Sequence, residues 1–232
     1  MTAGEVKSIA TDLGADLCGI APVDRFSGAP AGFHPKDIFG DCRSVLVFAR
    51  RLPSGSLFAS SCVPYTYFNR LITTEVEGLT LDLSRKLEAV GVGSVPVPSD
   101  DPSEYWEPDR SYARGILSLR HAGWLAGLGV LGRNTLLVND RLGNMMQLGA
   151  LLLDVDLEGD PIAAFQACKE ECRLCIDSCP QSALDGKTVD QRACRPLSNY
   201  KNERGFLLKK CWECRRVCPN HGGIETAGRI GP

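Results

Sequence analysis

The sequence predicts an α+β protein in which an α/β sandwich-type N-terminal domain is followed by a small cysteine-rich module. Strand-like and helix-like stretches alternate over the first two thirds of the chain, whereas eight of its eleven cysteines lie in the last third. The 232 residues suffice for one medium domain and one small one. We therefore expect residues 1–160 to form the first domain and residues 161–232 the second.

The N-terminal domain is predicted to open with a short helix and two strands. Apolar residues recur at helical spacing from Val6 to Leu13 and stop at Gly14, which indicates a helix. The stretch Leu17–Ala21 is strand-like, and the continuous apolar run Ser44–Ala49 is typical of a buried strand. A loop rich in Pro and Gly, residues 22–40, separates the two.

The clearest helix is expected from about Leu71 to Val90, because its apolar side chains are three or four residues apart and Gly91 ends the pattern. A Pro-rich loop, Val95–Asp109, leads to a second helix at about Ser118–Leu128. Two strand-like runs joined by a hairpin-like turn are expected to close the domain: Asn134–Asn139, the turn 140–143 and Met145–Asp154.

A glycine motif lies between the second helix and these strands. Gly127-Leu-Gly129-Val-Leu-Gly132 matches the pattern G-x-G-x-x-G of dinucleotide sites. Such a site needs a strand before the motif and a helix after it, but here a helix is expected before and a strand after. We therefore do not expect NAD to bind; the glycines either admit close approach of another flat cofactor or form a tight turn.

The bulk properties exclude several classes of protein. A formal net charge of −2 gives no overall attraction to nucleic acid. The chain has no run of eighteen apolar residues and no signal pattern at its N-terminus, so we expect a cytoplasmic protein without a membrane partner. Because thiols stay reduced in the cytoplasm, eleven cysteines favour metal ligands over disulfides.

The eight C-terminal cysteines have the spacing of iron–sulfur ligands. Two C-x2-C-x3-C-P motifs, ending at Cys179-Pro180 and Cys218-Pro219, are typical of ferredoxins with two clusters, in which one cysteine of each motif binds the other cluster. The first motif is preceded by Cys168 at a gap of three residues where the ferredoxin pattern has two. We predict a ferredoxin-like module with two 4Fe–4S clusters, one held by Cys168, Cys172, Cys175 and Cys218 and the other by Cys179, Cys194, Cys211 and Cys214.

Two alternatives stay open in this region. Pairs of the form C-x2-C also fit structural zinc sites. Nine basic and three acidic residues lie between Lys187 and Arg216, and they either bind a polyanion or offset the negative charge of thiolate-bound clusters. The remaining cysteines, Cys18, Cys42 and Cys62, are expected to be small buried hydrophobic residues.

Several stretches resemble the epoxyqueuosine reductase family, which is related to the reductive dehalogenases. They are Ala126–Leu137, Arg141–Gly143 continuing through Leu148-Gly149 to Asp154, Ala15–Pro22 and Cys42–Phe48. Together with the cysteine motifs, the resemblance covers nearly the whole chain. It implies that the N-terminal domain holds a base-off cobalamin, without a protein ligand to cobalt, and that the ferredoxin-like module supplies it with electrons.

The resemblance also suggests site residues. We expect the glycine turn to offer the corrin a surface without side chains, and the residues after the turn to hydrogen-bond its polar groups. This cofactor-binding set is Gly127, Gly129, Gly132, Arg133 and Asn134. His121, Tyr65 and Tyr67 are candidate catalytic residues, with a structural role for the histidine and aromatic packing for the tyrosines as alternatives.

Two departures from the family affect the expected substrate. Ala113 stands where the resemblance places the catalytic aspartate, and the chain stops at Pro232, before the helical-repeat domain that helps the family bind tRNA. We therefore expect tRNA to be a doubtful partner. The predicted function is an anaerobic oxidoreductase that takes electrons from a low-potential ferredoxin- or flavodoxin-type donor and reduces an unidentified small-molecule or tethered substrate. The alternatives are a non-enzymatic two-cluster electron-transfer protein and a zinc-stabilised scaffold.

Overall fold

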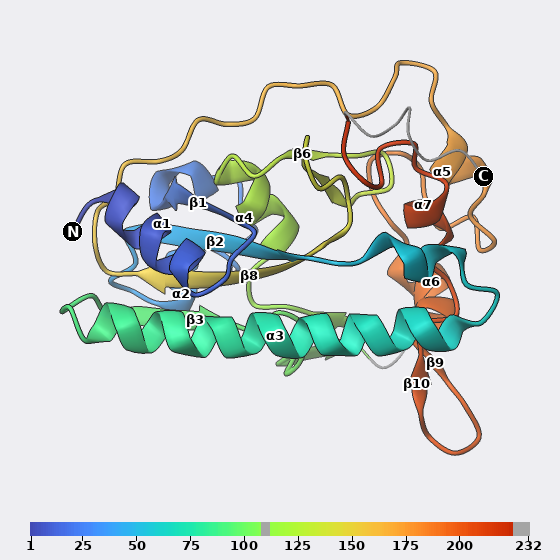
Figure 1. Cartoon of the computed structure of the whole chain (residues 1–232), viewed down its shortest axis with the longest axis horizontal. Helices are drawn as coiled ribbons and strands as arrows, with labels where there is room; N and C mark the ends of the chain where they lie inside the picture. The colour runs from blue at the N-terminus through green and yellow to red at the C-terminus, as the bar shows by residue number, and fades with distance from the viewer. Residues whose placement is uncertain (108–111, 225–232) are drawn as a thin grey trace.

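The computed structural model of the chain describes residues 1–107 and 112–224 (Figure 1). Its helices are α1 (Ala3–Asp12), η1 (Val23–Phe26), α2 (Pro35–Ile38), η2 (Ser54–Phe58), α3 (Cys62–Glu88), α4 (Leu119–Leu125), α5 (Leu174–Asp177), α6 (Gln191–Ser198) and α7 (Glu213–Arg216). Its strands are β1 (Leu17–Pro22), β2 (Ser44–Arg51), β3 (Ser94–Val97), β4 (Tyr105–Glu107), β5 (Tyr112–Arg114), β6 (Val130–Leu131), β7 (Leu137–Val138), β8 (Met146–Leu153), β9 (Tyr200–Lys201) and β10 (Leu207–Leu208).

A four-stranded antiparallel sheet of order β1-β2-β8-β3 forms the centre of the molecule. Strand β2 lies between β1 and β8, so that Leu46 is opposite Ile20 on one side and Leu151 on the other. The first six residues of β2 are all buried, because helices cover both faces of the sheet. The buried strand predicted at 44–49 is therefore confirmed.

Successive side chains of a β-strand point to opposite faces of the sheet, so the central strands contribute to two separate hydrophobic cores. On one face, Leu46 and Phe48 pack with α1 and with Val76 of α3. On the other face, Val45 and Val47 pack with η1 and α4. The helices thus sandwich the sheet, and Figure 1 shows α3 running along its whole length. The predicted α+β sandwich class is confirmed.

Helix α3 begins at Cys62, nine residues before the predicted start. The Oγ of Ser61 caps it by accepting a hydrogen bond from the N–H of Val63. Pro64 fits in the first turn, where its missing N–H costs no helical hydrogen bond. Although α3 has 27 residues, no helix in the described part of the chain combines the length and apolar character needed to cross a membrane.

The prediction of a hairpin around residues 140–143 is wrong. A tight turn is present, because Asn139 and Gly143 exchange both of their backbone hydrogen bonds. However, β7 pairs with β6, whereas β8 pairs with β2 and β3, so the turn joins strands of different sheets. The loop predicted at 95–109 contains β3 and β4, and its last two residues lie outside the described residues.

The chain leaves β8 along the sheet domain and then forms the cysteine-rich part, where α5, α6 and α7 gather near one end of α3 (Figure 1). Trp212 anchors this part: its Nε1 donates to the carbonyl of Leu57 at 2.9 Å, and its ring stacks on that of Tyr65. Lys209 donates its backbone N–H to Thr66 Oγ1 at 2.9 Å. The domain boundary near residue 160 stays a prediction, and residues 225–232 lie outside the described residues.

Replacing Gly149 by Ala should lower the free energy of unfolding by roughly 1–3 kcal/mol, because overpacking strains a filled core. An added Cβ would lie 2.6 Å from the Phe48 ring and 2.8 Å from Val76. Gly78→Ala is the matched control: Gly78 lies in α3 with open space around it, so alanine there should stabilise the helix by about 1 kcal/mol. Urea denaturation followed by circular dichroism measures both, and equal stability of the two variants would contradict the packing described.

Candidate functional site

The eight C-terminal cysteines lie on short elements that pack together. Cys175 is in α5, Cys194 in α6 and Cys214 in α7, and the others lie in the adjoining turns. Helices α5 and α7, one from each motif, contact each other. All of these cysteines are free thiols and all are buried or half-buried.

Electrostatic contacts separate the thiols into two groups. Burial raises the pKa of Cys218 to about 11, and the neighbouring thiols that add to this rise are Cys168, Cys175 and Cys172. Burial also raises the pKa of Cys211, and here the contributing thiols are Cys194 and Cys179. These electrostatic neighbours are compatible with the predicted ligand sets, and the assignment of the cysteines to two clusters stays a prediction.

The two groups lie next to each other at Cys214. Burial raises the pKa of this thiol to about 12, and the thiols that add to the rise are Cys194 and Cys211 of its own group, followed by Cys175 of the other. The Arg215 guanidinium opposes the rise. Because a metal or cluster binds thiolates, occupation of these sites must release protons.

Buried polar atoms beside the cysteines have no hydrogen-bond partner within the described residues. They are both amide atoms of Asn144 and Nε2 of His221. The Asn144 carbonyl accepts a hydrogen bond from Arg215, next to Cys214, and Nδ1 of His221 lies 2.9 Å from the carbonyl of Cys218. Buried polar atoms usually have a partner, so these orphaned atoms fit a polar group outside the polypeptide. Across the described residues, no three His, Cys, Asp or Glu side chains are arranged to hold a single metal ion.

Arg133 and Asn134, predicted to bind a corrin, instead contact the cysteine motifs. Arg133 donates its backbone N–H to the sulfur of Cys168 at 3.5 Å, and its guanidinium donates to the carbonyls of Cys172, at 2.8 Å, and Glu170. The side-chain amide of Asn134 donates to the carbonyl of Cys214 at 3.0 Å. Their expected role toward a cofactor stays a prediction, but both are engaged within the chain.

The three glycines of the turn face the chain's own atoms. A Cβ added at Gly127 would lie 2.2 Å from the carbonyl oxygen of Pro161, and one at Gly129 would lie 2.2 Å from that of Val138. At Gly132 it would lie 2.8 Å from Oδ1 of Asn134. Glycine is thus required here for close internal packing. A corrin surface at this turn stays a prediction, and these contacts do not favour it.

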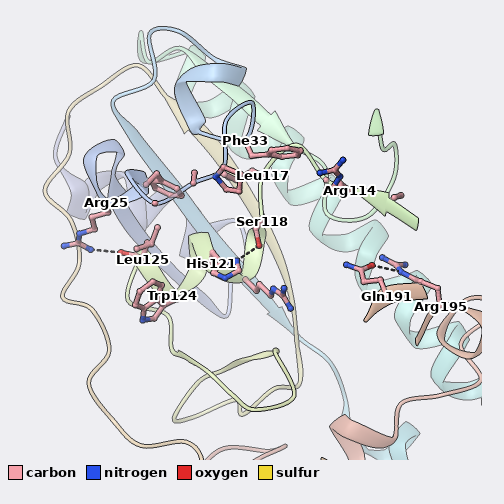
Figure 2. Close-up of a pocket in the computed structure, with 17 residues that line it drawn as sticks. Arg25, Phe33, Arg114, Leu117, Ser118, His121, Trp124, Leu125, Gln191 and Arg195 are labelled. Atoms are coloured by element: carbon pink, nitrogen blue, oxygen red, sulfur yellow. Dashed lines mark hydrogen bonds between the residues drawn. The ribbon is translucent and has the colours of Figure 1, made fainter. Parts of the chain in front are cut away.

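A pocket of about 730 Å³ opens between η1 with the loop after it, α4 and α6 (Figure 2). Its charged and aromatic lining comprises Arg25, Arg114, Arg120, Arg195, His121, Phe26, Phe33 and Trp124. Among the described residues that line it, none is acidic. The pocket is therefore suited to a ligand with anionic or hydrogen-bond-accepting groups and an apolar body.

His121 is the predicted catalytic residue that lines this pocket. Its Nδ1 lies 2.7 Å from Oγ of Ser118, as Figure 2 shows, and burial together with the charge of Arg120 lowers its pKa. Ala113 lines the same pocket. Tyr65 and Tyr67 do not: Tyr65 is buried against Trp212, and Tyr67 is exposed on α3.

The arginines of the pocket were not predicted from the sequence, and they come from four separate segments. Arg25 follows β1 and donates to the carbonyl of Leu125. Arg195 lies in α6 and donates to Gln191 (Figure 2). Residues so far apart along the chain have no common spacing, and only Arg195 belongs to a basic stretch that the sequence analysis recognised.

That basic stretch, residues 187–216, has several roles. Arg215 counters the charge of the Cys214 thiolate, as expected for cations that offset a cluster. Lys201, Arg204 and Lys210 are exposed around the β9–β10 hairpin, which projects from the body in Figure 1. For these residues the polyanion alternative stays open.

No family model matches the chain, but proteins of known function do. It is 35% identical to the epoxyqueuosine reductase of Staphylococcus aureus over 123 residues, which are 48% of this chain and 32% of the relative. It is 25% identical to that of Leadbetterella byssophila over 93% of this chain and 78% of the relative. The chain is a relative of the epoxyqueuosine reductases. The resemblance predicted from its motifs is confirmed.

Solved structures show the same fold. The epoxyqueuosine reductase of Streptococcus thermophilus superposes with a TM-score of 0.68 at 19% identity, covering 95% of this chain and 66% of that one. The catabolic reductive dehalogenase NpRdhA, in complex with 3-bromo-4-hydroxybenzoic acid, superposes with a TM-score of 0.72 at 17% identity, covering 96% and 32%. The chain thus spans about a third to two thirds of most of these proteins.

Arg120→Gln should raise the pKa of His121 without bringing it to its ordinary value of about 6.5, because burial is the larger cause of the lowering. Arg114→Gln is the matched control, since Arg114 lines the same pocket but is not among the causes. NMR titration of the imidazole protons measures the pKa. Because the folded-state pKa lies below that of the unfolded chain, protonation of His121 should destabilise the fold as pH falls below about 6.5. An unchanged pKa of His121 in Arg120→Gln would contradict the contribution of the Arg120 charge.

Proposed function

We propose that this chain is an iron–sulfur reductase in which two 4Fe–4S clusters pass electrons to a base-off cobalamin that reduces an unidentified substrate. The observation that supports the proposal is that buried thiols from both motifs are electrostatic neighbours. Two groups of four would each supply the thiolates that a cubane needs. The orphaned polar atoms of Asn144 and His221 fit the same sites.

The geometry supports an order for electron flow. Cys194 of the second group lies in α6, and Gln191 and Arg195 of the same helix line the pocket. The second cluster would therefore lie beside the pocket. The first cluster, bound by Cys168, Cys172, Cys175 and Cys218, would receive electrons from the donor and pass them on.

We propose that part of the corrin enters this open pocket rather than lying against the glycine turn. The pocket has a volume of about 730 Å³, apolar walls such as Leu117 and Leu125, and arginines suited to the amide and phosphate groups of the cofactor. His121 is the one histidine among the described lining residues, and its Nδ1 engages Ser118. That cobalt has no protein ligand is proposed on the family resemblance alone. When bound, cobalamin would supply a strongly reducing cobalt centre for the substrate.

The residues of the pocket would bind the substrate and transfer a proton to it. The arginines orient anionic groups, and the rings of Phe33 and Trp124 exclude water from an apolar body. With Ala113 at the position expected for the family's catalytic aspartate, His121 is the group that would hold a proton near the substrate. Its lowered pKa favours the neutral imidazole, which would take up a proton from solvent before passing it to the substrate, while Ser118 orients the ring through the hydrogen bond to Nδ1.

The partners are proposed as a low-potential ferredoxin- or flavodoxin-type donor and a small-molecule or tethered substrate. The comparisons give no support to the expectation that tRNA is a doubtful partner. One similar structure, with a TM-score of 0.61 at 20% identity, is an epoxyqueuosine reductase with an epoxyqueuosine-modified tRNA-Tyr stem loop. We therefore keep a modified tRNA among the candidate tethered substrates, and we propose a cytoplasmic, anaerobic setting for the reaction.

Two other functions fit fewer observations. A non-enzymatic electron carrier would account for the clusters, but it gives no role to the arginine-lined pocket beside α6. A zinc-stabilised scaffold would use the same thiols without electron transfer. Metal analysis separates the scaffold from the other two functions, and cobalamin binding separates the reductase from the carrier.

Anaerobically prepared protein should contain about eight iron and eight sulfide per chain. Cys218→Ser should damage the cluster of Cys168, Cys172 and Cys175, whereas Cys179→Ser should damage that of Cys194, Cys211 and Cys214. Electron paramagnetic resonance of the reduced variants distinguishes the two. Cys42→Ser is the control, because Cys42 is buried in the sheet domain and both clusters should survive. Stoichiometric zinc, or damage in each variant confined to the other cysteines of the mutated motif, would contradict the assignment.

Gly28→Phe should weaken cobalamin retention several-fold, because Gly28 lines the pocket and has open space where the ring would go. Gly55→Phe is the matched control, being equally open but outside the pocket lining. Anaerobic reconstitution followed by gel filtration and visible spectroscopy measures bound corrinoid. Both variants should keep their iron. Equal retention by the two variants would exclude this pocket as the cobalamin site.

A further inference from the structure

We propose that Arg133 is a positioning residue that raises the reduction potential of the first cluster, and that with Asn134 it ties both clusters to the sheet domain. We call Arg133 and Asn134 the bridge. The inference rests on the proposed function for the clusters themselves. It gives these two residues a role different from the corrin binding that the sequence suggested.

The bridge reaches both cysteine groups from one turn. Arg133 contacts Cys168 and Cys172 of the first group, and Asn134 contacts Cys214 of the second. The turn lies between β6 and β7, which pack on the sheet domain beside α4. Consecutive residues therefore place the two groups relative to each other and to the domain that holds the pocket.

Arg133 has two means of stabilising a reduced cluster. Its backbone N–H points at the sulfur of Cys168 at 3.5 Å, and a hydrogen bond to a ligand sulfur favours the more negative, reduced state. Its half-buried guanidinium adds a positive charge close to the same group, held by the carbonyls of Cys172 and Glu170. Within the described residues no carboxylate forms an ion pair with this guanidinium, so no counter-ion there offsets its positive charge near the cluster.

Asn134 supplies a neutral contact and a rigid turn. Its side chain is buried, donates to the carbonyl of Cys214 and accepts from the N–H of Leu136. Gly132 leaves room for that side chain, since a Cβ there would lie 2.8 Å from its Oδ1. Because Asn134 carries no charge, its effect on the second cluster should be smaller than that of Arg133 on the first.

The bridge is also joined to the pocket. The residue after it, Thr135, has a φ of 63°, in the left-handed region, and its carbonyl accepts a hydrogen bond from the guanidinium of Arg120 at 3.1 Å. Arg120 lines the pocket next to His121. The backbone of residues 133–135, with the hydrogen bonds at its two ends, thus connects the pocket wall to the cysteine motifs.

The test is the midpoint potential of each cluster in anaerobic holoprotein, measured by redox titration with electron paramagnetic resonance. Arg133→Gln removes the charge and should shift the midpoint of the first cluster to a more negative value, with a smaller shift for the second. Arg133→Lys keeps the charge and should restore the wild-type midpoint. Arg173→Gln is the matched control: Arg173 lies within the first cysteine motif, but it is exposed and paired with Asp177 at 3.2 Å, so both midpoints should be unchanged.

The outcomes separate this inference from the proposed function. Wild-type protein without iron would refute the clusters themselves. If both clusters contain iron and the midpoint potential of the first cluster is the same in Arg133→Gln and Arg173→Gln, the role of Arg133 is overturned and the proposed function is not. Arg133→Gln could also lose its iron. In that case, a wild-type midpoint in Arg133→Lys supports the proposal. Loss of iron from both variants would show that Arg133 is a structural residue and would overturn the proposal.

Discussion

None of the hydrophobic core clusters of the described residues lies in the cysteine-rich part, so its position depends on how the sheet domain holds it. Its helices α5 and α7 have four residues each, and its two paired strands have two. Elements this short bury little apolar surface by themselves. Contacts from the sheet domain supply the missing support: Trp212 against α3, Arg215 on the carbonyl of Asn144, and the Arg133–Asn134 bridge. The pocket can therefore lie within reach of α6.

The state of the thiols makes metal occupation part of this stability. Burial raises the pKa values of Cys214 and Cys218 to about 12 and 11, so without a metal these groups are neutral at pH 7. A cluster would bind the thiolates, release their protons and link both motifs by covalent bonds. The orphaned polar atoms of Asn144 and His221 would then face a filled site. We infer that the cysteine-rich part is most stable with its clusters in place.

Local patterns in the sequence predicted what depends on spacing, and failed where distant segments meet. The run at 44–49 became β2, and the cysteine motifs became short elements that pack together, α5 against α7. The hairpin at 140–143 was misjudged, because what pairs with β8 is decided by residues far along the chain. The pocket was missed for the same reason: Arg25 and Arg195 are brought together only by the fold.

The proposed arrangement links substrate charge to electron transfer. Arg195 lines the pocket and directly follows Cys194, so it would lie between the substrate and the second cluster. An anion bound at Arg195 offsets a positive charge that otherwise favours the reduced cluster, so the cluster becomes a stronger reductant once the pocket is filled. The electron would then be released mainly when an anionic substrate is present. In this proposal, a pocket lined by arginines beside a cluster ligand would both bind the substrate and time its reduction.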